Sequence, residues 1–281
     1  MSSDSATIKP IETDITLETV LQFARTLPAP VFVGIDAALG VPARLADSIE
    51  SSPTPKISTF LDWIIWLFVY GSPDEPVNTP DIWSPGQPFI AVPPGKGSKL
   101  AFSQAGIQMH RGVEQGLNAN SPLIVSGIPG TVGSGSRELW RELSQYLQTN
   151  SPDFNIWPYD GSLEKLFHQE SEAHSITLAE IYPKVCYGIA LAATLPTKLR
   201  AISKTKEPIR KHVIDELIGM LDGQLEIESI EHCYRSEDDF DAMISVVAMH
   251  KLMQYPKLFF SEPDTHPMEG GVMGKQGLML S

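Results

Sequence analysis

The chain has 281 residues, of which 42% are apolar and 20% are charged, so it is long enough to bury a core and has the composition of a globular protein. Its formal net charge of −13 argues against a protein that coats nucleic acid, because phosphate contacts need a basic surface. The acidity does not exclude an enzyme that meets phosphates through bound metal ions, since the metal supplies the positive charge. Two cysteines are too few for a disulfide framework.

The cellular location follows by elimination. Residues 1–14 lack the apolar core of a signal peptide, and the most apolar run, residues 60–70, is too short to cross a bilayer and contains Asp62. We therefore expect a cytoplasmic protein without a membrane partner. Residues 1–15 are expected to form a flexible tail before a single domain over residues 16–281.

The first predicted elements are a helix and a strand. Leucines and other apolar residues recur at helical spacing over residues 17–27, with Thr16 as the N-cap and Pro28 after the end. Residues 31–36 are apolar β-formers that close on Asp36, which predicts a buried parallel strand. Residues 60–70 are predicted to form a buried helix, or one used in self-association.

Residues 71–98 are rich in proline and glycine, which disfavours regular structure. Because Trp83, Phe89 and Ile90 need apolar surroundings, we expect a long ordered loop that buries them. A loop of this length is usually functional or part of an insertion, which we place at about residues 50–120.

The second half of the chain alternates strands and helices, which predicts one mostly parallel sheet. At least residues 31–36, 123–127 and 176–181 are expected to pair in it. The further elements are a helix over residues 137–147, a strand over 154–159, helices around 184–203 and 207–223, and a last helix from after Ser236 to about 254.

Residues 130–136 form a glycine-rich segment between a strand and a helix, where a phosphate cradle would lie. Ser136 stands where a P-loop has its lysine, so nucleotide hydrolysis of that type is rejected. Two interpretations remain, weak anion binding at the helix start and a tight turn with several left-handed glycines, and we favour the turn. Histidine spacing gives no zinc motif, and no nucleophile elbow is present.

The carboxylates carry a stronger signal. Asp36 and Glu180 each end an apolar strand, and ligands bind at the carboxyl ends of parallel strands. Asp238 and Asp241 are three residues apart and share a helix face. Acids grouped on rigid elements are how Mg²⁺ or Mn²⁺ is held, so these four residues predict a metal site. The alternative is that acids in a first helical turn only favour the helix dipole, which we prefer for Asp239 because Ser236 caps it.

Four segments together resemble the domain-of-unknown-function 429 family, with its IDxPxGLP, WPF, E-[VI]-[YH]-P and DDxxDA motifs. They are residues 33–42, 156–159, 179–183 and 238–242. Residues 269–274 are similar to the family's closing EGWI-x-G, so the resemblance covers about residues 17–275.

The resemblance implies a ribonuclease-H-like core and a predicted nuclease, in which a mixed or parallel sheet is flanked by helices. It implies that Asp36, Glu180 and Asp241 are catalytic, that Asp238 joins them as a metal ligand, and that nucleic acid is met through Mg²⁺ or Mn²⁺. The chain departs from the family at the start, because the usual first strands, one with a leading aspartate, are not visible before residue 17. We therefore expect an N-terminally shortened fold whose open edge is covered by residues 1–15 or by self-association.

Three functions follow as hypotheses. The first is a metal-dependent nuclease that hydrolyses phosphodiester bonds. The second is a catalytically impaired relative that acts as a binding or assembly module, which the missing strand favours. The third, a phosphotransferase of the actin-like ATPase class, ranks last because no phosphate-binding hairpin is visible near the start.

Overall fold

The computed structural model describes residues 6–11, 15–52, 56–92, 98–125, 131–150, 152–168, 176–221 and 225–279. The protein is a mixed α/β structure whose chain divides into two compact units, where the sequence pattern predicted one domain. The larger unit holds Ile15–Glu180 and Glu262–Val272. The smaller unit holds Met1–Asp14, Ile181–Ser261 and Met273–Ser281.

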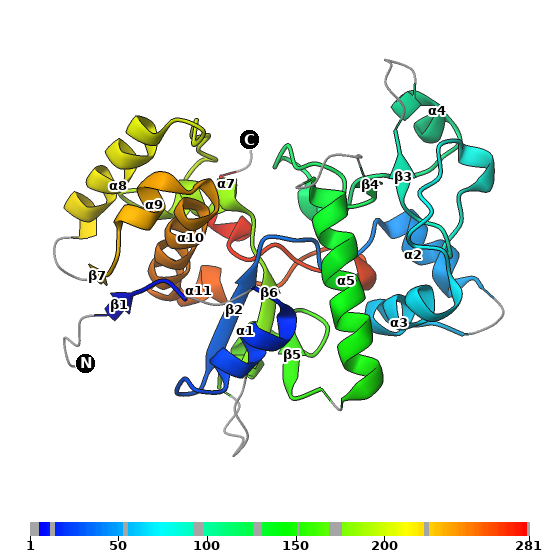
Figure 1. The fold of residues 1–281 in the computed structure, drawn as a ribbon, viewed down its shortest axis with the longest axis horizontal. Coiled ribbons are helices and arrows are strands. Elements are labelled where there is room, and N and C mark those ends of the chain that lie inside the picture. Colours follow the sequence, from blue (N-terminus) through cyan, green and yellow to red (C-terminus); the bar gives the residue numbers. More distant parts are fainter. Residues whose placement is uncertain are drawn as a thin grey trace. The chain divides into compact units, whose positions relative to one another are not determined.

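A three-stranded parallel sheet lies in the larger unit, in the order β2–β6–β5 (Figure 1). The strands are β2 (Val31–Ile35), β6 (Ile176–Glu180) and β5 (Phe154–Ile156). The predicted pairing of residues 31–36 with 176–181 is confirmed, in a register that sets Ile35 beside Glu180. All five residues of β6 are buried, as a central strand with a continuous apolar run should be.

A second sheet pairs β3 (Ile90–Ala91) with β4 (Ile124–Val125), also in parallel. The prediction that residues 123–127 share a sheet with 31–36 is therefore wrong for the part of that segment that the structure describes; Ser126 and Gly127 lie outside it. The partner of β4 is β3, which lies in the proline-rich segment, where the composition gives no sign of a strand. The prediction that this segment is ordered by burial is confirmed for Phe89 and Ile90, while Trp83 is half-buried.

Helix α5 (Val132–Thr149) packs against α3 (Phe60–Tyr70) and α1 (Leu17–Ala24), as Figure 1 shows. Helices α3 and α5 meet through aromatic side chains: the rings of Trp63 and Trp140 lie 5.6 Å apart, edge to face. The predicted helix over residues 60–70 is thus confirmed, with Phe60, Trp63, Ile64 and Leu67 buried, while Val69 and Tyr70 at its end are exposed.

Helix α5 begins at Val132, five residues before the predicted start at residue 137, because Gly133 and Gly135 are helical and do not form the expected turn. An ideal Cβ on Gly133 would lie 2.2 Å from the carbonyl oxygen of Ile124. The glycine therefore allows the first turn of the helix to touch the backbone of β4, and it serves close packing rather than a left-handed turn.

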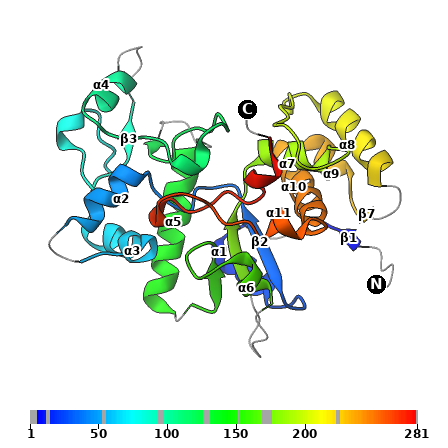
Figure 2. The same cartoon turned by 180° about the vertical axis from the view of Figure 1, so that it is seen from behind.

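The other helical elements of the larger unit are short. They are α2 (Ala43–Glu50), α4 (Ser98–Gln104), α6 (Leu163–Phe167), and the 3-10 helices η1 (Pro80–Ile82), η2 (Gly112–Glu114) and η3 (Pro267–Glu269). Helix α6 lies beside β2, where Phe167 stacks on Phe32 at 5.7 Å (Figure 2).

The smaller unit is mainly helical. Its elements are α7 (Pro183–Ala190), α8 (Glu207–Leu221), α9 (Glu231–Arg235), α10 (Glu237–Met253), α11 (Pro256–Phe259), η4 (Lys275–Gly277), and the parallel strands β1 (Ala6–Ile8) and β7 (Leu225–Ile227). The predicted last helix is confirmed, and it packs against α7. Helix α7 ends at Ala190 instead of near residue 203, and Pro196 lies in the irregular stretch that follows.

Residues 6–8 form a strand, so the expected flexible tail is wrong for this part of residues 1–15. These residues pair with β7 and not with the edge of β2, which among the described residues pairs only with β6. Self-association as a way to cover that edge stays a prediction. Among the described residues, no helix combines the length and apolar character needed to cross a membrane.

Candidate functional site around Arg111

Two of the predicted site residues lie at neighbouring strand ends in the larger unit. Glu180 is the last residue of β6, and Asp36 directly follows β2. Since Ile35 is paired with Glu180, the two strands end side by side. Glu180 is 5% exposed, whereas Asp36 is exposed to solvent.

The carboxylate of Glu180 is bound by the guanidinium of Arg111. The Nη2 group donates to Oε1 at 2.5 Å, and Nη1 donates to Oε2 at 2.7 Å. The backbone N–H of Leu39 adds a further bond to Oε2 at 2.8 Å. Both oxygens are therefore engaged in a two-pronged pair, the strongest arrangement that an arginine makes with a carboxylate.

Arg111 also joins two further glutamates to this pair. Its Nε donates to Oε1 of Glu114 at 2.7 Å, and its Nη1 donates to the carbonyl oxygen of Glu269 at 3.1 Å. The Glu269 carboxylate in turn accepts the backbone N–H groups of Gly112 at 2.8 Å and Ala43 at 3.0 Å. A single buried cation thus connects β6, η2 and η3, and we call Arg111, Glu114, Glu180 and Glu269 the Arg111 cluster.

Burial and charge act against each other in the Arg111 cluster. Burial alone would lower the pKa of Arg111, but the carboxylates of Glu180 and Glu114 outweigh it and raise that pKa. Burial likewise would raise the pKa of Glu114, yet His110 and Arg111 hold it below the ordinary value. For Glu180 burial prevails over the attraction of Arg111, so its pKa is raised.

Glycines make room for this arrangement. An ideal Cβ on Gly112 would lie 2.7 Å from Oε2 of Glu269. Gly270 has a φ of +73°, and a Cβ there would lie 2.0 Å from the carbonyl oxygen of Leu39. The segment after β2 and the segment of η3 can therefore approach closely, and the hydroxyl of Tyr159 donates to the Leu39 carbonyl at 2.7 Å.

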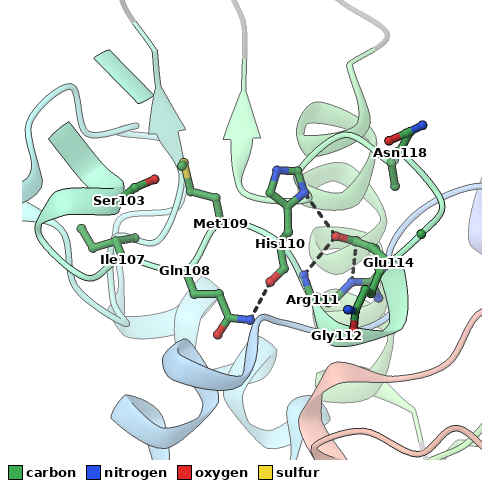
Figure 3. A pocket seen from close by; sticks show the side chains of 12 residues that line it. Ser103, Ile107, Gln108, Met109, His110, Arg111, Gly112, Glu114 and Asn118 are labelled. Carbon is green, nitrogen blue, oxygen red and sulfur yellow. Dashed lines mark hydrogen bonds and ion pairs between the residues drawn. The ribbon is translucent and has the colours of Figure 1, made fainter. Parts of the chain in front are cut away.

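A pocket of about 730 Å³ opens above the cluster, within residues 103–119. Figure 3 shows His110 and Arg111 both joined to Glu114 at its wall. His110 is half-exposed, and its Nδ1 lies 3.6 Å from Oε2 of Glu114, which is ion-pair range. The Nε2 group of Gln108 donates to the carbonyl oxygen of His110 at 2.8 Å. The pocket wall is thus polar and rests on a fixed buried network.

The other two predicted acids lie on α10 in the smaller unit. The buried carboxylate of Asp241 accepts hydrogen bonds from the hydroxyl of Tyr187 and the ammonium of Lys204. Asp238 is exposed in the first turn of α10. Ser236 caps that helix by accepting the N–H of Asp239 at 3.1 Å, as the sequence predicted.

A cation therefore already contacts each buried predicted acid: a guanidinium at Glu180 and an ammonium at Asp241. No group of three histidine, cysteine, aspartate or glutamate side chains is placed to hold a metal ion within the part of the chain that the structure describes. As arranged, the residues do not fit a Mg²⁺ or Mn²⁺ ion, and the four-acid metal site stays a prediction.

The glycine-rich segment offers little for anion binding. Gly130 lies outside the described residues, and residues 132–136 form the first turns of α5. The hydroxyls of Thr131 and Ser134 bond to each other at 2.8 Å. The expected left-handed turn is wrong for Gly133 and Gly135, since both glycines are helical.

Comparison with known proteins gives no match. No family model matches the sequence, and neither a curated protein nor a solved structure matches the chain.

Sequence reasoning missed Arg111 and Glu114, which hold the centre of the site. Their spacing of three residues was visible, and it places both side chains on one side of a helical turn. Nothing local indicated that the arginine would be buried, because its main partner Glu180 is 69 residues away along the chain.

Proposed function

We propose that this chain is a binding module on a ribonuclease-H-like core, and that it takes a small polar ligand in the pocket above the Arg111 cluster. The observation that carries the proposal is the two-pronged bond between Arg111 and Glu180, which uses the carboxylate that a nuclease would offer to its metal ion. Arg111 and Glu114 of the cluster also line the pocket.

Replacing the guanidinium by a metal ion would be unfavourable. Both oxygens of Glu180 would have to leave Arg111. The side chain of Arg111 is only 1% exposed, so water could hardly replace the lost carboxylate. Breaking a buried ion pair costs about 3–5 kcal/mol, because a charge is left without a partner. A cation at Glu180 would have to recover that energy before it bound at all.

The pocket has the properties of a preformed ligand site. Its polar groups, among them His110, Gln108 and Glu114, are held by backbone hydrogen bonds or ion pairs. Side chains fixed before binding lose little conformational entropy when a ligand arrives, which favours affinity. Ile107 and Met109 add apolar wall to these polar groups, the combination that small-molecule sites show.

The test is a thermal-shift screen of the full chain with a panel of sugars, amino acids, amines and nucleosides. We expect at least one class to raise the Tm, and expect His110→Ala to reduce that ligand-induced rise, measured from the Tm of the ligand-free variant. His212→Ala, a change at an exposed histidine of the smaller unit, is the matched control. A panel without any stabilising compound, or a response unaffected by His110→Ala, contradicts the proposal.

A metal-dependent nuclease is the second candidate, favoured by the adjacent strand ends that carry Asp36 and Glu180. In this proposal Asp36 and Glu180, at the ends of the paired strands β2 and β6, would supply carboxylate ligands to Mg²⁺ or Mn²⁺ once Glu180 is released from Arg111. The test is cleavage of single- and double-stranded nucleic acid with Mn²⁺, by wild type and Asp36→Asn. Cleavage that Asp36→Asn abolishes supports the nuclease and contradicts the binding module.

A further inference from the structure

A second pocket, of about 490 Å³, lies in the larger unit outside the Arg111 cluster. One wall is α2, with Arg44, Asp47 and Ser48, and the other is formed by η1 and the loop after α4. We call it the Arg44 pocket. It shares only Ile107 with the pocket above the Arg111 cluster.

The guanidinium of Arg44 is oriented by the protein. Its Nη1 donates to the carbonyl oxygen of Gly106 at 2.9 Å, and its backbone N–H donates to Gln108 at 3.2 Å. Gly106 has a φ of +80°, and an ideal Cβ there would lie 3.2 Å from that Nη1. The bond to Gly106 uses one of the five guanidinium N–H donors of this exposed side chain.

An aromatic wall stands in the same pocket. The indole N–H of Trp83 donates to the carbonyl oxygen of Pro88 at 3.0 Å, which fixes the ring in its half-buried position. Pro80 and Ile107 add apolar surface beside it. An indole held in place next to apolar side chains offers a surface on which a planar ring can stack.

Helix α2 also places polar groups in the Arg44 pocket. Asp47 lies one turn after Arg44, and its exposed carboxylate can accept from a ring N–H group. The Nε2 atom of His266 lies 3.7 Å from Oδ1 of that carboxylate. The hydroxyl of Ser48 donates to the Arg44 carbonyl oxygen at 2.8 Å, so it is held on the helix. One cation, one acceptor and one ring surface therefore meet in the Arg44 pocket.

We propose that the Arg44 pocket binds a planar nitrogen heterocycle that carries a phosphate, such as a nucleoside monophosphate. The ring stacks on Trp83, the phosphate pairs with Arg44, and Asp47 accepts from the ring. Arginine and phosphate match in geometry because the fork offers two parallel donors. This inference does not rest on the proposed function, since it uses none of the residues of the Arg111 cluster.

The test is isothermal titration calorimetry of the full chain with adenosine monophosphate, adenosine and inorganic phosphate as probes. We expect the monophosphate to bind most tightly, because only it offers both ring and phosphate. Arg44→Met, which keeps an apolar stem, should weaken the monophosphate by about tenfold or more and leave adenosine unchanged. Trp83→Phe should weaken adenosine and the monophosphate together.

Arg235→Met, at an exposed arginine of the smaller unit, is the matched control for loss of charge. Far-ultraviolet circular dichroism and the Tm of each variant show that the fold is intact. The proposal is overturned if the monophosphate does not bind, if its affinity is the same in Arg44→Met, or if inorganic phosphate binds as tightly as the monophosphate.

Discussion

The guanidinium of Arg111 meets both carboxylate oxygens of Glu180, at 2.5 and 2.7 Å, at the carboxyl end of the central strand β6. Arg111 directly precedes η2 and Glu180 comes from the sheet, so the pair links two segments that are distant in sequence. Because both side chains are almost fully buried, the pair is shielded from salt and water.

Removing the charge of Glu180 should destabilise the larger unit strongly. Glu180→Gln keeps the size of the side chain but leaves the buried guanidinium with one carboxylate fewer, and we expect a loss of about 3–5 kcal/mol in the free energy of unfolding. Urea denaturation measures it. Glu138→Gln is the control, because its contact with Arg141 is exposed and should change stability by less than about 0.5 kcal/mol. Equal effects of the two changes would contradict the account.

Glu114 should make the protein sensitive to acid. Its folded-state pKa lies below the ordinary value of 4.5, so the unfolded chain binds protons more readily than the folded one. The stabilisation is therefore present above about pH 4.5 and is lost as the pH falls through the lowered pKa. We expect Glu114→Gln to have a flatter fall in Tm below that pH than wild type. An unchanged acid slope would show that His110 and Arg111 do not hold the carboxylate ionised.

The two glycines in the first turns of α5 should respond in opposite ways to alanine. Gly133→Ala places a methyl group against the Ile124 backbone and should destabilise by about 1–3 kcal/mol, the usual cost of overpacking. Gly135→Ala meets nothing within 4 Å and should stabilise by up to about 1 kcal/mol through helix propensity. Urea denaturation measures the change in the free energy of unfolding for both variants. A Gly133→Ala variant as stable as wild type would argue against the close approach of α5 to β4.

Asp241 and Asp238, the two predicted site acids of α10, should differ in how much they contribute to stability. Asp241→Asn loses the charge that Lys204 contacts in a mostly buried position, and we expect a cost of about 1.5–3 kcal/mol. Asp238→Asn changes an exposed side chain and should stay within about 0.5 kcal/mol. Thermal unfolding of both variants compares them directly. A larger loss of stability for Asp238→Asn than for Asp241→Asn would contradict the finding that Asp241 is buried and Asp238 is exposed.

The parts of the fold that the sequence predicted are those with local signals. The continuous apolar runs identified β2 and β6, and Ser236 with the acids after it identified the start of α10. Helix α3 followed from its aromatic run and its length. In each case the signal, an apolar pattern or a cap residue, lies within the element or directly before it.

The rest depended on contacts between distant segments. The pairing of β3 with β4 has a register of only two residues and lies in proline-rich surroundings, so composition hid it. Gly133 lies in α5 close to the backbone of Ile124, a contact that no local pattern reveals. The predicted acids at Glu180 and Asp241 are buried, but the cations that contact them come from other segments and were invisible to spacing arguments.

The central claim is that Arg111 occupies Glu180 in place of a metal ion, and Mn²⁺ binding tests it most directly. Bound Mn²⁺ is measured from the loss of the free-ion electron paramagnetic resonance signal, in wild type and in Asp36→Asn and Glu180→Gln. The account predicts only weak binding that neither substitution changes, as expected for an acidic surface. A saturable Mn²⁺ site that disappears in both variants would contradict it and would restore the metal-dependent nuclease.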